Sequence, residues 1–521
     1  MIFSSVTVIT SFAGQFNSLN LSSTQSTNKI AFTSTNQSIT IQSNQDFTTL
    51  QSIFKWPGDG TAKSPIIIQN FNFTQLNLHS SNDVISIQNT DLYFILRENI
   101  ITTNSTFNQL SQHSIYLKNV ANGRILDNNI TSQDFKGFGI YINNSKNIQL
   151  TNNIVNDFFY GALISNSNIT VSNNLFENCY VGTSFSDIGL TDTTGNPVYW
   201  VARFQENFYF HSNTGLEVIG TEFYFIKYNI VIEGNTFSTN SIGLTISAYS
   251  VNLRDNYFSQ NTNIALKLTR SLNSNVTNNK FDHNHYGIKI IEPSYIDSYK
   301  LVNCGINPHI PECGEPLVNN TIYLHFSNIT ISNNIISNQS YYGIYIANRC
   351  DFNKIIGNNL LNNTIQAYQL STNFWSNNTL GNFWSNYNGT DTNNDGFGDS
   401  PYVIQQNGED LKPLMKKQQI TINNSDLGQI KYVSPDLADS IIHYSIFMIP
   451  IIAVSVSVIT AAVIYKYKKY VAQLKPNQKK ISFSRYFKRN LKLKPKEKPG
   501  TLHADKALEM LEEIMDETNK T

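Results

Sequence analysis

A short asparagine-containing phrase recurs through most of this 521-residue chain. An Asn-Asn or Asp-Asn pair is followed by one or two apolar residues and then by a segment of the type Gly-Ile-x-Ile, as at Asn333-Asn334-Ile335 and residues 343–346. A fixed period of 20 to 50 residues is typical of repeat architectures. The second Asn of the copies, spaced 21 to 25 residues apart within each group, lies at Asn129, Asn153 and Asn174, then at Asn235, Asn256 and Asn279, and then at Asn334 and Asn359.

The repeated phrase predicts an all-β fold of stacked coils. Its apolar residues alternate with other residues or form short runs, and these stretches are bounded by Asn, Ser and Gly. This pattern is typical of strands and turns. Asn and Gly tolerate the left-handed backbone that sharp corners require. Coils stacked at about 4.8 Å would pair their backbones and bury Ile, Leu, Phe and Val. We therefore expect a parallel β-helix (a solenoid). A β-sandwich would lack the longer period, and a disordered chain would have fewer aromatic residues than the 12% found here.

The phrase resembles the repeats of NosD-like proteins of the archaeal cell-surface type, over about residues 60–415. The resemblance implies a right-handed, single-stranded parallel β-helix, an architecture shared with carbohydrate-binding and sugar-hydrolase domains. Residues 381–414 are similar to the closing segment of such proteins, which implies a C-terminal cap. The family name carries an association with copper. With 5 Met and 9 scattered His, however, the chain shows no soft-ligand set for Cu(I), so copper binding is not carried over.

The formal net charge is zero, but the charges are unevenly distributed. Residues 441–465 contain no Asp, Glu, Lys or Arg, and they are long enough to cross a hydrocarbon core of about 30 Å. Many basic residues follow, so the positive-inside rule places the C-terminus in the cytoplasm. We predict a single-pass plasma-membrane protein with a large extracellular N-terminal domain. The first residues lack a basic n-region, and they are either a vestigial signal or a first strand.

The predicted tail is basic and attracts anionic lipids. Its short amphipathic helix would be marginal alone, so we expect it to dock on a transporter, on another cytoplasmic partner or on the chain itself. The predicted segments are a vestigial signal with N-terminal strands or a cap at 1–59, repeats at 60–380 with an insertion at 292–318, a cap with an Asp-rich loop at 381–420, a stalk at 421–440, a membrane helix at 441–465, and a cytoplasmic tail at 466–521 with a helix at 502–517.

The Asp-rich loop resembles a calcium-binding loop. Oxygen-bearing side chains alternate before and after Gly396, and hard oxygens suit Ca²⁺. The twelfth position is Tyr402 rather than the bidentate Glu of an EF-hand. The loop either binds Ca²⁺ or is a solvated set of Asx turns, and no other cofactor is expected. The predicted calcium ligands are Asp391, Asn393, Asp395 and Asp399.

The densest ionisable cluster consists of Asp282, His283 and His285. Alternate residues of a strand share one face, so the two imidazoles could bind a metal or act on a sugar. Alternatively, these residues are outward-pointing corner positions of one repeat.

The four cysteines and several sequons fit an exported domain. We predict a disulfide between Cys304 and Cys313 inside the insertion. Cys179 and Cys350 are expected several coils apart, beyond disulfide reach of each other; Cys350 with an insertion cysteine is the alternative pairing. Predicted glycosylation sites on Asn-x-Ser/Thr sequences are Asn72, Asn104, Asn168, Asn275, Asn328 and Asn388.

The sequence favours binding over catalysis. Polysaccharide hydrolysis needs paired carboxylates, or a base beside a cation, and only the tripeptide at 89–91 matches a pectin-hydrolase-like set. Exposed Tyr residues on a long sheet face could stack sugar rings. We expect a cell-surface scaffold or a module that binds a glycan or surface-layer partner, and no nucleic-acid partner. The alternatives are a polysaccharide lyase, hydrolase or epimerase, or a NosD-like accessory to membrane transport or metal maturation.

Overall fold

A computed structural model describes most of the repeat region. It covers residues 33–34, 38–73, 83–103, 112–186, 201–220, 229–291, 328–406 and 408–422. None of the helices described there is long and apolar enough to cross a membrane. The predictions that lie wholly or largely outside the described residues are the vestigial signal at the start of 1–59, the insertion at 292–318, the Cys304–Cys313 disulfide, the sequon at Asn104, the stalk at 421–440, the membrane helix at 441–465, and the tail with its helix at 502–517.

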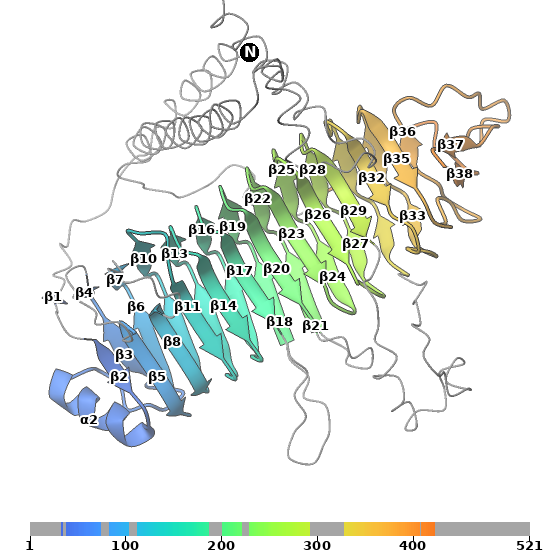
Figure 1. Cartoon of the computed structure of the whole chain (residues 1–521). Helices are drawn as coiled ribbons and strands as arrows, with labels where there is room; N and C mark the ends of the chain where they lie inside the picture. Colours follow the sequence, from blue (N-terminus) through green and yellow to red (C-terminus); the bar gives the residue numbers. More distant parts are fainter. Residues whose placement is uncertain are drawn as a thin grey trace, which may run out of the picture. The chain divides into compact units, whose positions relative to one another are not determined.

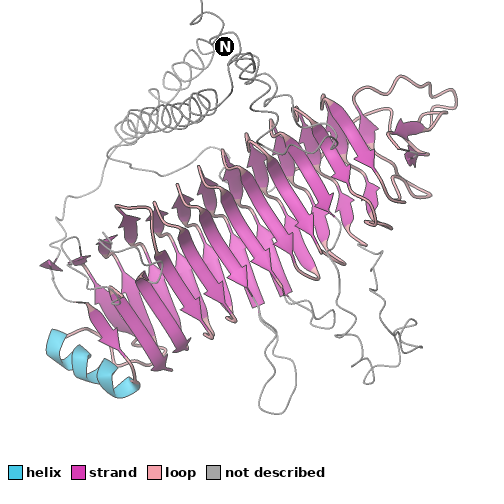
Figure 2. Cartoon of the chain, in the orientation of Figure 1, coloured by secondary structure: helices cyan, strands magenta, loops and turns pink. Residues whose placement is uncertain are grey.

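Three parallel sheets wind around a common core, and each coil contributes a strand to each sheet (Figure 1). We name them sheets A, B and C; they contain 13, 12 and 11 strands. The chain passes from sheet C to sheet A to sheet B within each coil and then enters sheet C again. Strands dominate the described chain (Figure 2). The prediction of a right-handed parallel β-helix is confirmed.

The strands are as follows. Sheet A contains β1 (Thr33–Ser34), β4 (Phe71–Phe73), β7 (Ile100–Thr103), β10 (Asn129–Ser132), β13 (Ile154–Asn156), β16 (Leu175–Glu177), β19 (Phe208–Phe210), β22 (Thr236–Ser238), β25 (Tyr257–Ser259), β28 (Lys280–Asp282), β31 (Ile335–Ser337), β34 (Asn359–Leu361) and β36 (Phe383–Trp384). Sheet B contains β2 (Ile39–Ile41), β5 (Ile85–Thr90), β8 (His113–Val120), β11 (Phe138–Asn143), β14 (Tyr160–Ser165), β17 (Val181–Ser186), β20 (Thr214–Ile219), β23 (Ile242–Ser247), β26 (Ile264–Thr269), β29 (Tyr286–Ile291), β32 (Tyr342–Ile346) and β35 (Ile365–Gln369). Sheet C contains β3 (Ile66–Gln69), β6 (Phe94–Arg97), β9 (Gly123–Leu126), β12 (Ile148–Thr151), β15 (Ile169–Ser172), β18 (Val201–Gln205), β21 (Asn229–Glu233), β24 (Val251–Arg254), β27 (Asn275–Thr277), β30 (Thr330–Ser332) and β33 (Lys354–Ile356).

The recurring Asn pair makes the corner between sheets C and A. Its first residue adopts a left-handed backbone, with φ of 55° at Asn173, a region that Asn tolerates well. Its second residue, Asn174, is fully buried. The Oδ1 atom of Asn174 accepts from the backbone N and the Nδ2 of Asn153, at 2.9 Å each. Its own Nδ2 donates to the Oδ1 of Asn207 at 3.0 Å and to two backbone carbonyls. Each buried amide is therefore satisfied by its neighbours in the stack.

We call this column of amides the inner ladder. It corrects the sequence alignment at two copies, because Asn128 and Asn358, rather than Asn129 and Asn359, are the rungs that bond to Asn153 and Asn334. Asn129 and Asn359 instead lie in strands of sheet A. The ladder also contains three rungs outside the copies of the phrase: Glu precedes Asn99 and Asn207, and Gly precedes Asn382. The rungs are Asn99, Asn128, Asn153, Asn174, Asn207, Asn235, Asn256, Asn279, Asn334, Asn358 and Asn382.

Asn279 and Asn334 are 55 residues apart in the sequence but lie in successive coils. Their side chains are direct neighbours in the inner ladder, at 3.1 Å, and β27 pairs with β30 in register. Residues 292–327 join the end of β29 to the chain before β30. The stack therefore continues without a break on either side of this connection.

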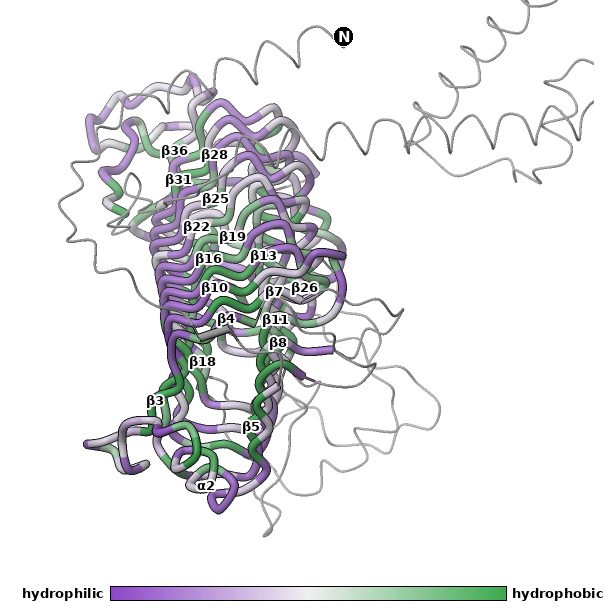
Figure 3. The backbone as a smooth tube through the Cα atoms, turned by 90° about the vertical axis from the view of Figure 1, so that its left-hand side faces the viewer, coloured by the Kyte–Doolittle hydropathy of each residue, from purple (hydrophilic) through white to green (hydrophobic). Residues whose placement is uncertain are grey.

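The interior is a set of apolar columns. The inward residues of the strands are fully buried, and in sheet A they form a stack of rings along the axis, with centroid distances of 4.7 to 5.3 Å. Hydrophobic and hydrophilic stripes continue from coil to coil (Figure 3). Burial of these side chains is the main favourable contribution to folding. The stacked rings are Phe176, Tyr209, Phe237, Phe258 and Phe281.

Each end of the stack is capped. Helix α2 (Asn44–Phe54) covers the N-terminal end with Phe47, which is fully buried. This helix is not among the elements predicted from the sequence. The predicted C-terminal cap contains Trp384 and the antiparallel pair β37 (Tyr402–Ile404) and β38 (Gly408–Asp410). Such caps cover the apolar ends that a solenoid would otherwise expose.

Candidate ligand-binding face

The outward face of sheet B carries in-register aromatic side chains at two places. The residue between the two apolar positions of each Gly-Ile-x-Ile segment points outward, and these residues are partners across successive strands. From β8 to β35 the outward column reads Tyr116, Tyr141, Leu163, Ser184, Glu217, Thr245, Lys267, Lys289, Tyr345 and Tyr368. The column has aromatic residues at both ends, and between them one Leu is followed by five polar or charged residues.

We call the aromatic group on β8, β11 and β14 the N-terminal platform. The rings of Tyr116 and Tyr141 stack at 5.3 Å, and those of Phe138 and Tyr160 stack at 5.5 Å. His113 lies 5.0 Å from the ring of Tyr116, and its Nδ1 is 2.6 Å from a carboxylate oxygen of Asp83.

The group on β29, β32 and β35 is the C-terminal platform. The rings of Tyr345 and Tyr368 stack at 5.5 Å with an interplanar angle of only 2°. Tyr286 and Tyr342 stack beside them, also at 5.5 Å. Burial, followed by the neighbouring Tyr368, raises the pKa of Tyr345. The phenol therefore stays protonated and can donate a hydrogen bond at neutral pH.

Two lysines adjoin the C-terminal platform. Lys267 on β26 pairs in register with Lys289 on β29. The Nζ of Lys289 lies 4.4 Å from the ring centroid of Tyr286 and 5.5 Å from that of Tyr345. Burial and the charge of Lys267 lower the pKa of Lys289.

Long connections flank the same sheet. Residues 187–200, 221–228 and 292–327 each follow a strand of sheet B, namely β17, β20 and β29. Connections of similar length to the shortest of these, at 74–82 and 104–111, follow β4 and β7 of sheet A, so the longer connections do not all leave from one sheet. The outward column can be predicted from the sequence, because each of its residues occupies the variable position x of a Gly-Ile-x-Ile-like segment. The lysine pair is not among the site residues predicted from the sequence.

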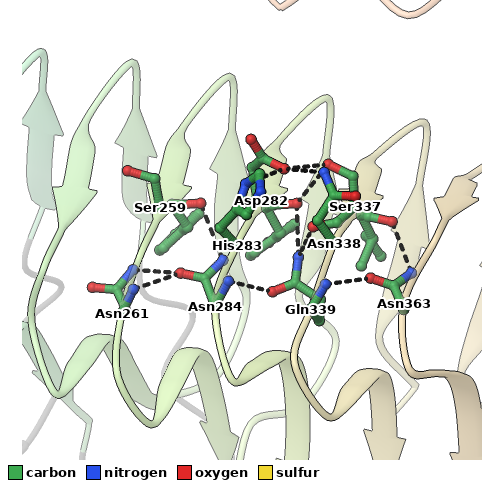
Figure 4. A network of polar contacts seen from close by, with 12 residues as sticks. Ser259, Asn261, Asp282, His283, Asn284, Ser337, Asn338, Gln339 and Asn363 are labelled. Atoms are coloured by element: carbon green, nitrogen blue, oxygen red, sulfur yellow. Dashed lines mark hydrogen bonds and ion pairs between the residues drawn. The ribbon is translucent and has the colours of Figure 1, made fainter. Parts of the chain in front are cut away.

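The histidine cluster is only partly brought together (Figure 4). His283 is an exposed corner residue with φ of 54°, and its Nδ1 lies 3.1 Å from Asp282. His285 instead contacts the next coil, where its Nδ1 is 2.9 Å from Ser340 Oγ. The structure therefore does not place the two imidazoles as a pair on one strand face.

Asp282 acts as a hydrogen-bond acceptor between coils. Its Oδ1 accepts from Ser337 Oγ at 2.7 Å and from Asn338 Nδ2 at 3.0 Å. Burial alone would raise the pKa of Asp282, but these two hydrogen bonds and the contact with His283 outweigh it and lower the pKa. Below this cluster runs a second buried amide ladder, which links Asn240, Asn261, Asn284, Gln339 and Asn363.

The Asp-rich loop is organised by its own backbone. The Asp391 carboxylate accepts from the backbone N of Asp395 and of Gly396, and that of Asp399 accepts from the backbone N of Thr392. The last of these hydrogen bonds lowers the pKa of Asp399. Within the described residues, no group of three or more His, Cys, Asp or Glu side chains is placed to hold a metal ion. Calcium binding at Asp391, Asn393, Asp395 and Asp399 stays a prediction.

The described cysteines are buried and lie in different coils. Cys179 precedes β17 and Cys350 precedes β33, so they are not joined to each other. Burial raises the pKa of the Cys179 thiol to about 12, which keeps it protonated.

The described sequons differ in exposure. The side chains of Asn275, Asn328 and Asn388 are exposed. Asn72 and Asn168 are partly buried, and Asn168 Oδ1 accepts from the backbone N of Val201 at 2.7 Å. The three exposed residues are the better candidates for modification.

Comparison with known proteins agrees with the fold. Residues 59–199 match the right-handed β-helix region model, and residues 202–300 and 316–389 match the model of the periplasmic copper-binding protein NosD. A curated relative, the "Probable ABC transporter binding protein NosD" of Stutzerimonas stutzeri, is 32% identical over 121 residues. The matched segment covers 21% of this chain and 28% of that protein.

The solved structures to which the chain is similar match it at low identity. The periplasmic alginate epimerase AlgG is 12% identical with a TM-score of 0.36, and the alignment covers 65% of this chain and 82% of that one. The catalytic unit of a GH87 alpha-1,3-glucanase from Streptomyces thermodiastaticus is 13% identical with a TM-score of 0.39, with coverage of 66% and 69%. A resemblance at this level does not extend to activity or substrate. By its coils the chain is a right-handed parallel β-helix protein, and its sequence is similar to NosD over residues 202–300 and 316–389.

Proposed function

We propose that this protein is a non-catalytic glycan-binding module of the cell surface, anchored by the segment 441–465 and glycosylated at exposed sequons. The observation that carries the proposal is the pair of aromatic platforms on one face of sheet B. Apart from Tyr342, which is buried, their rings are partly exposed and repeat at the rung spacing of about 4.8 Å. Partly exposed tyrosine rings present apolar surface with a polar hydroxyl, which suits pyranose rings.

The test uses the full-length protein in detergent micelles and a panel of immobilised polysaccharides. Retention is measured together with the release of soluble sugar. Tyr345→Ala should weaken retention about tenfold, as expected for loss of an aromatic anchor, whereas Tyr345→Phe should retain most of it. The matched control is Tyr257→Ala, which removes a ring from the outward face of sheet A. Release of sugar would instead support a polysaccharide-active enzyme, and no retention on any polymer would refute glycan binding.

A second candidate is an accessory factor of a membrane transporter. It is favoured by the NosD match and by the printed name of the curated relative, which refers to an ABC transporter. This function predicts that the full-length chain copurifies with a transporter and that removal of residues 466–521 abolishes the association. Unchanged copurification after this truncation would contradict a role for the tail.

A further inference from the structure

The lysine pair on sheet B forms an uncompensated cationic site. Lys267 and Lys289 lie opposite each other on adjacent parallel strands, where like charges destabilise the sheet. Neither ammonium makes an ion pair with any carboxylate of the described residues. Glu217 is the outward residue two strands before Lys267, about 10 Å away at the rung spacing.

The rings around Lys289 hold its charge at the edge of the C-terminal platform. Its ammonium lies over the ring of Tyr286 and near that of Tyr345, and both contacts are in the range of cation–π interactions. The next ring pair, Tyr345 with Tyr368, is stacked with nearly parallel planes. A group of partly exposed aromatic rings therefore adjoins two positive charges on neighbouring rungs.

We propose, building on the glycan-binding function above, that this end of sheet B recognises an acidic polysaccharide. A uronic-acid ring packs against the exposed parts of Tyr345 and Tyr368, and its carboxylate binds Lys289 and Lys267. An anion at this position relieves the repulsion between the two ammonium groups and makes charge-assisted hydrogen bonds to them. Two lysines are too few to neutralise the backbone of a nucleic acid, which needs many phosphate contacts.

The experiment compares each acidic polymer with its own neutral form. Binding of the full-length protein in micelles is measured against polygalacturonate, alginate and hyaluronate, and against methyl-esterified forms of the same polymers. At least one acid form should bind about tenfold more tightly than its ester, because hydrogen bonds to charged groups are the stronger ones. The preference should shrink as NaCl screens the charges.

Substitution of the two lysines tests whether they cause the preference for the acid form over the ester. Lys289→Gln and Lys267→Gln should each reduce the ratio of acid-form to ester binding, and the double variant should bring that ratio to about one. The matched control is Lys280→Gln on sheet A, whose Nζ lies 5.0 Å from the ring of Tyr257 and which should change neither form's binding. Thermal unfolding of each variant checks that its fold is intact.

Three outcomes overturn the inference, and they are distinguishable from failure of the proposed function. If acid and ester bind equally while Tyr345→Ala weakens both, the protein binds glycans but this acidic specificity is wrong. If dextran sulfate binds as tightly as the best uronic-acid polymer and Tyr345→Ala has no effect, the lysines attract polyanions without recognising a sugar. If no polymer of either form binds, both the inference and the glycan-binding function fail.

Discussion

At the residue scale, the two adjacent asparagines of the repeated phrase have different structural roles. Asn173 occupies a left-handed corner and is exposed, whereas Asn174 is buried and bonded on all sides. Backbone tolerance explains the first position, and a buried amide that can both donate and accept explains the second. The repeated Asn-Asn phrase is therefore two separate requirements that happen to favour the same amino acid.

Substitutions at this dipeptide should separate the two roles. Asn174→Ala removes the acceptor of two N–H groups and should destabilise the protein by about 2–5 kcal/mol, because buried donors are left unsatisfied. Asn173→Gly should be nearly neutral, since Gly adopts the corner freely. Chemical denaturation of the two variants measures the difference. Equal losses would contradict the assignment of roles.

Asp410 ends the inner ladder in the C-terminal cap. Its fully buried carboxylate accepts from the backbone N of Asn382 at 2.7 Å and from Trp384 Nε1 at 2.9 Å. Asn382 needs an acceptor here because no further Asn rung follows it. Burial raises the pKa of Asp410, although these hydrogen bonds oppose the shift.

The raised pKa of Asp410 predicts how the stability of the fold changes with pH. The folded state favours the protonated acid, so this contribution to stability is fully present below the ordinary pKa of 3.8 and is lost as the pH rises through the raised pKa. The melting temperature of the wild type, relative to Asp410→Asn, should therefore rise as the pH falls from 7 toward 4. A constant difference between the two proteins over this range would refute the assignment.

At the element scale, helix α2 depends on a local cap and on one polar link to the sheet. Ser43 Oγ accepts from the backbone N of Asp46, three residues on, as in a capping box. The side chain of Asn44 bonds to Asp91 Oδ1 at 2.8 Å and to Thr90 Oγ1 at 2.6 Å. The tripeptide that resembled a hydrolase motif thus anchors the N-terminal cap.

The burial of Phe47 predicts the cost of weakening this cap. Phe47→Ala should lower the free energy of unfolding by about 3–5 kcal/mol, as for other large-to-small core changes, with the loss concentrated at the N-terminal coils. Hydrogen exchange should show faster opening of β2 and β5 than of β32 and β35. Phe54→Ala, at a side chain that is 47% exposed, is the matched control and should have a smaller effect.

At the scale of the whole chain, the described coils and the predicted membrane segment suggest two different environments. The anchoring hypothesis predicts that the full-length protein sediments with membranes and resists extraction by high salt. A chain that ends at residue 440 should be recovered in the soluble fraction, because the only long uncharged apolar segment is removed. Membrane recovery of both forms would contradict anchoring by residues 441–465.

The sequence by itself determined the stacked fold, because the period of the asparagine phrase predicts the length of each coil and the Asn pair marks its corner. It did not reveal the rungs at Asn99 and Asn207, where Glu takes the corner position. Only the tertiary structure decided which residues meet across coils: Lys267 beside Lys289, Tyr345 beside Tyr368, and Asp410 at the end of the amide ladder. These contacts join positions that are far apart along the chain, and connections of unequal length hide their register until the coils are aligned in space.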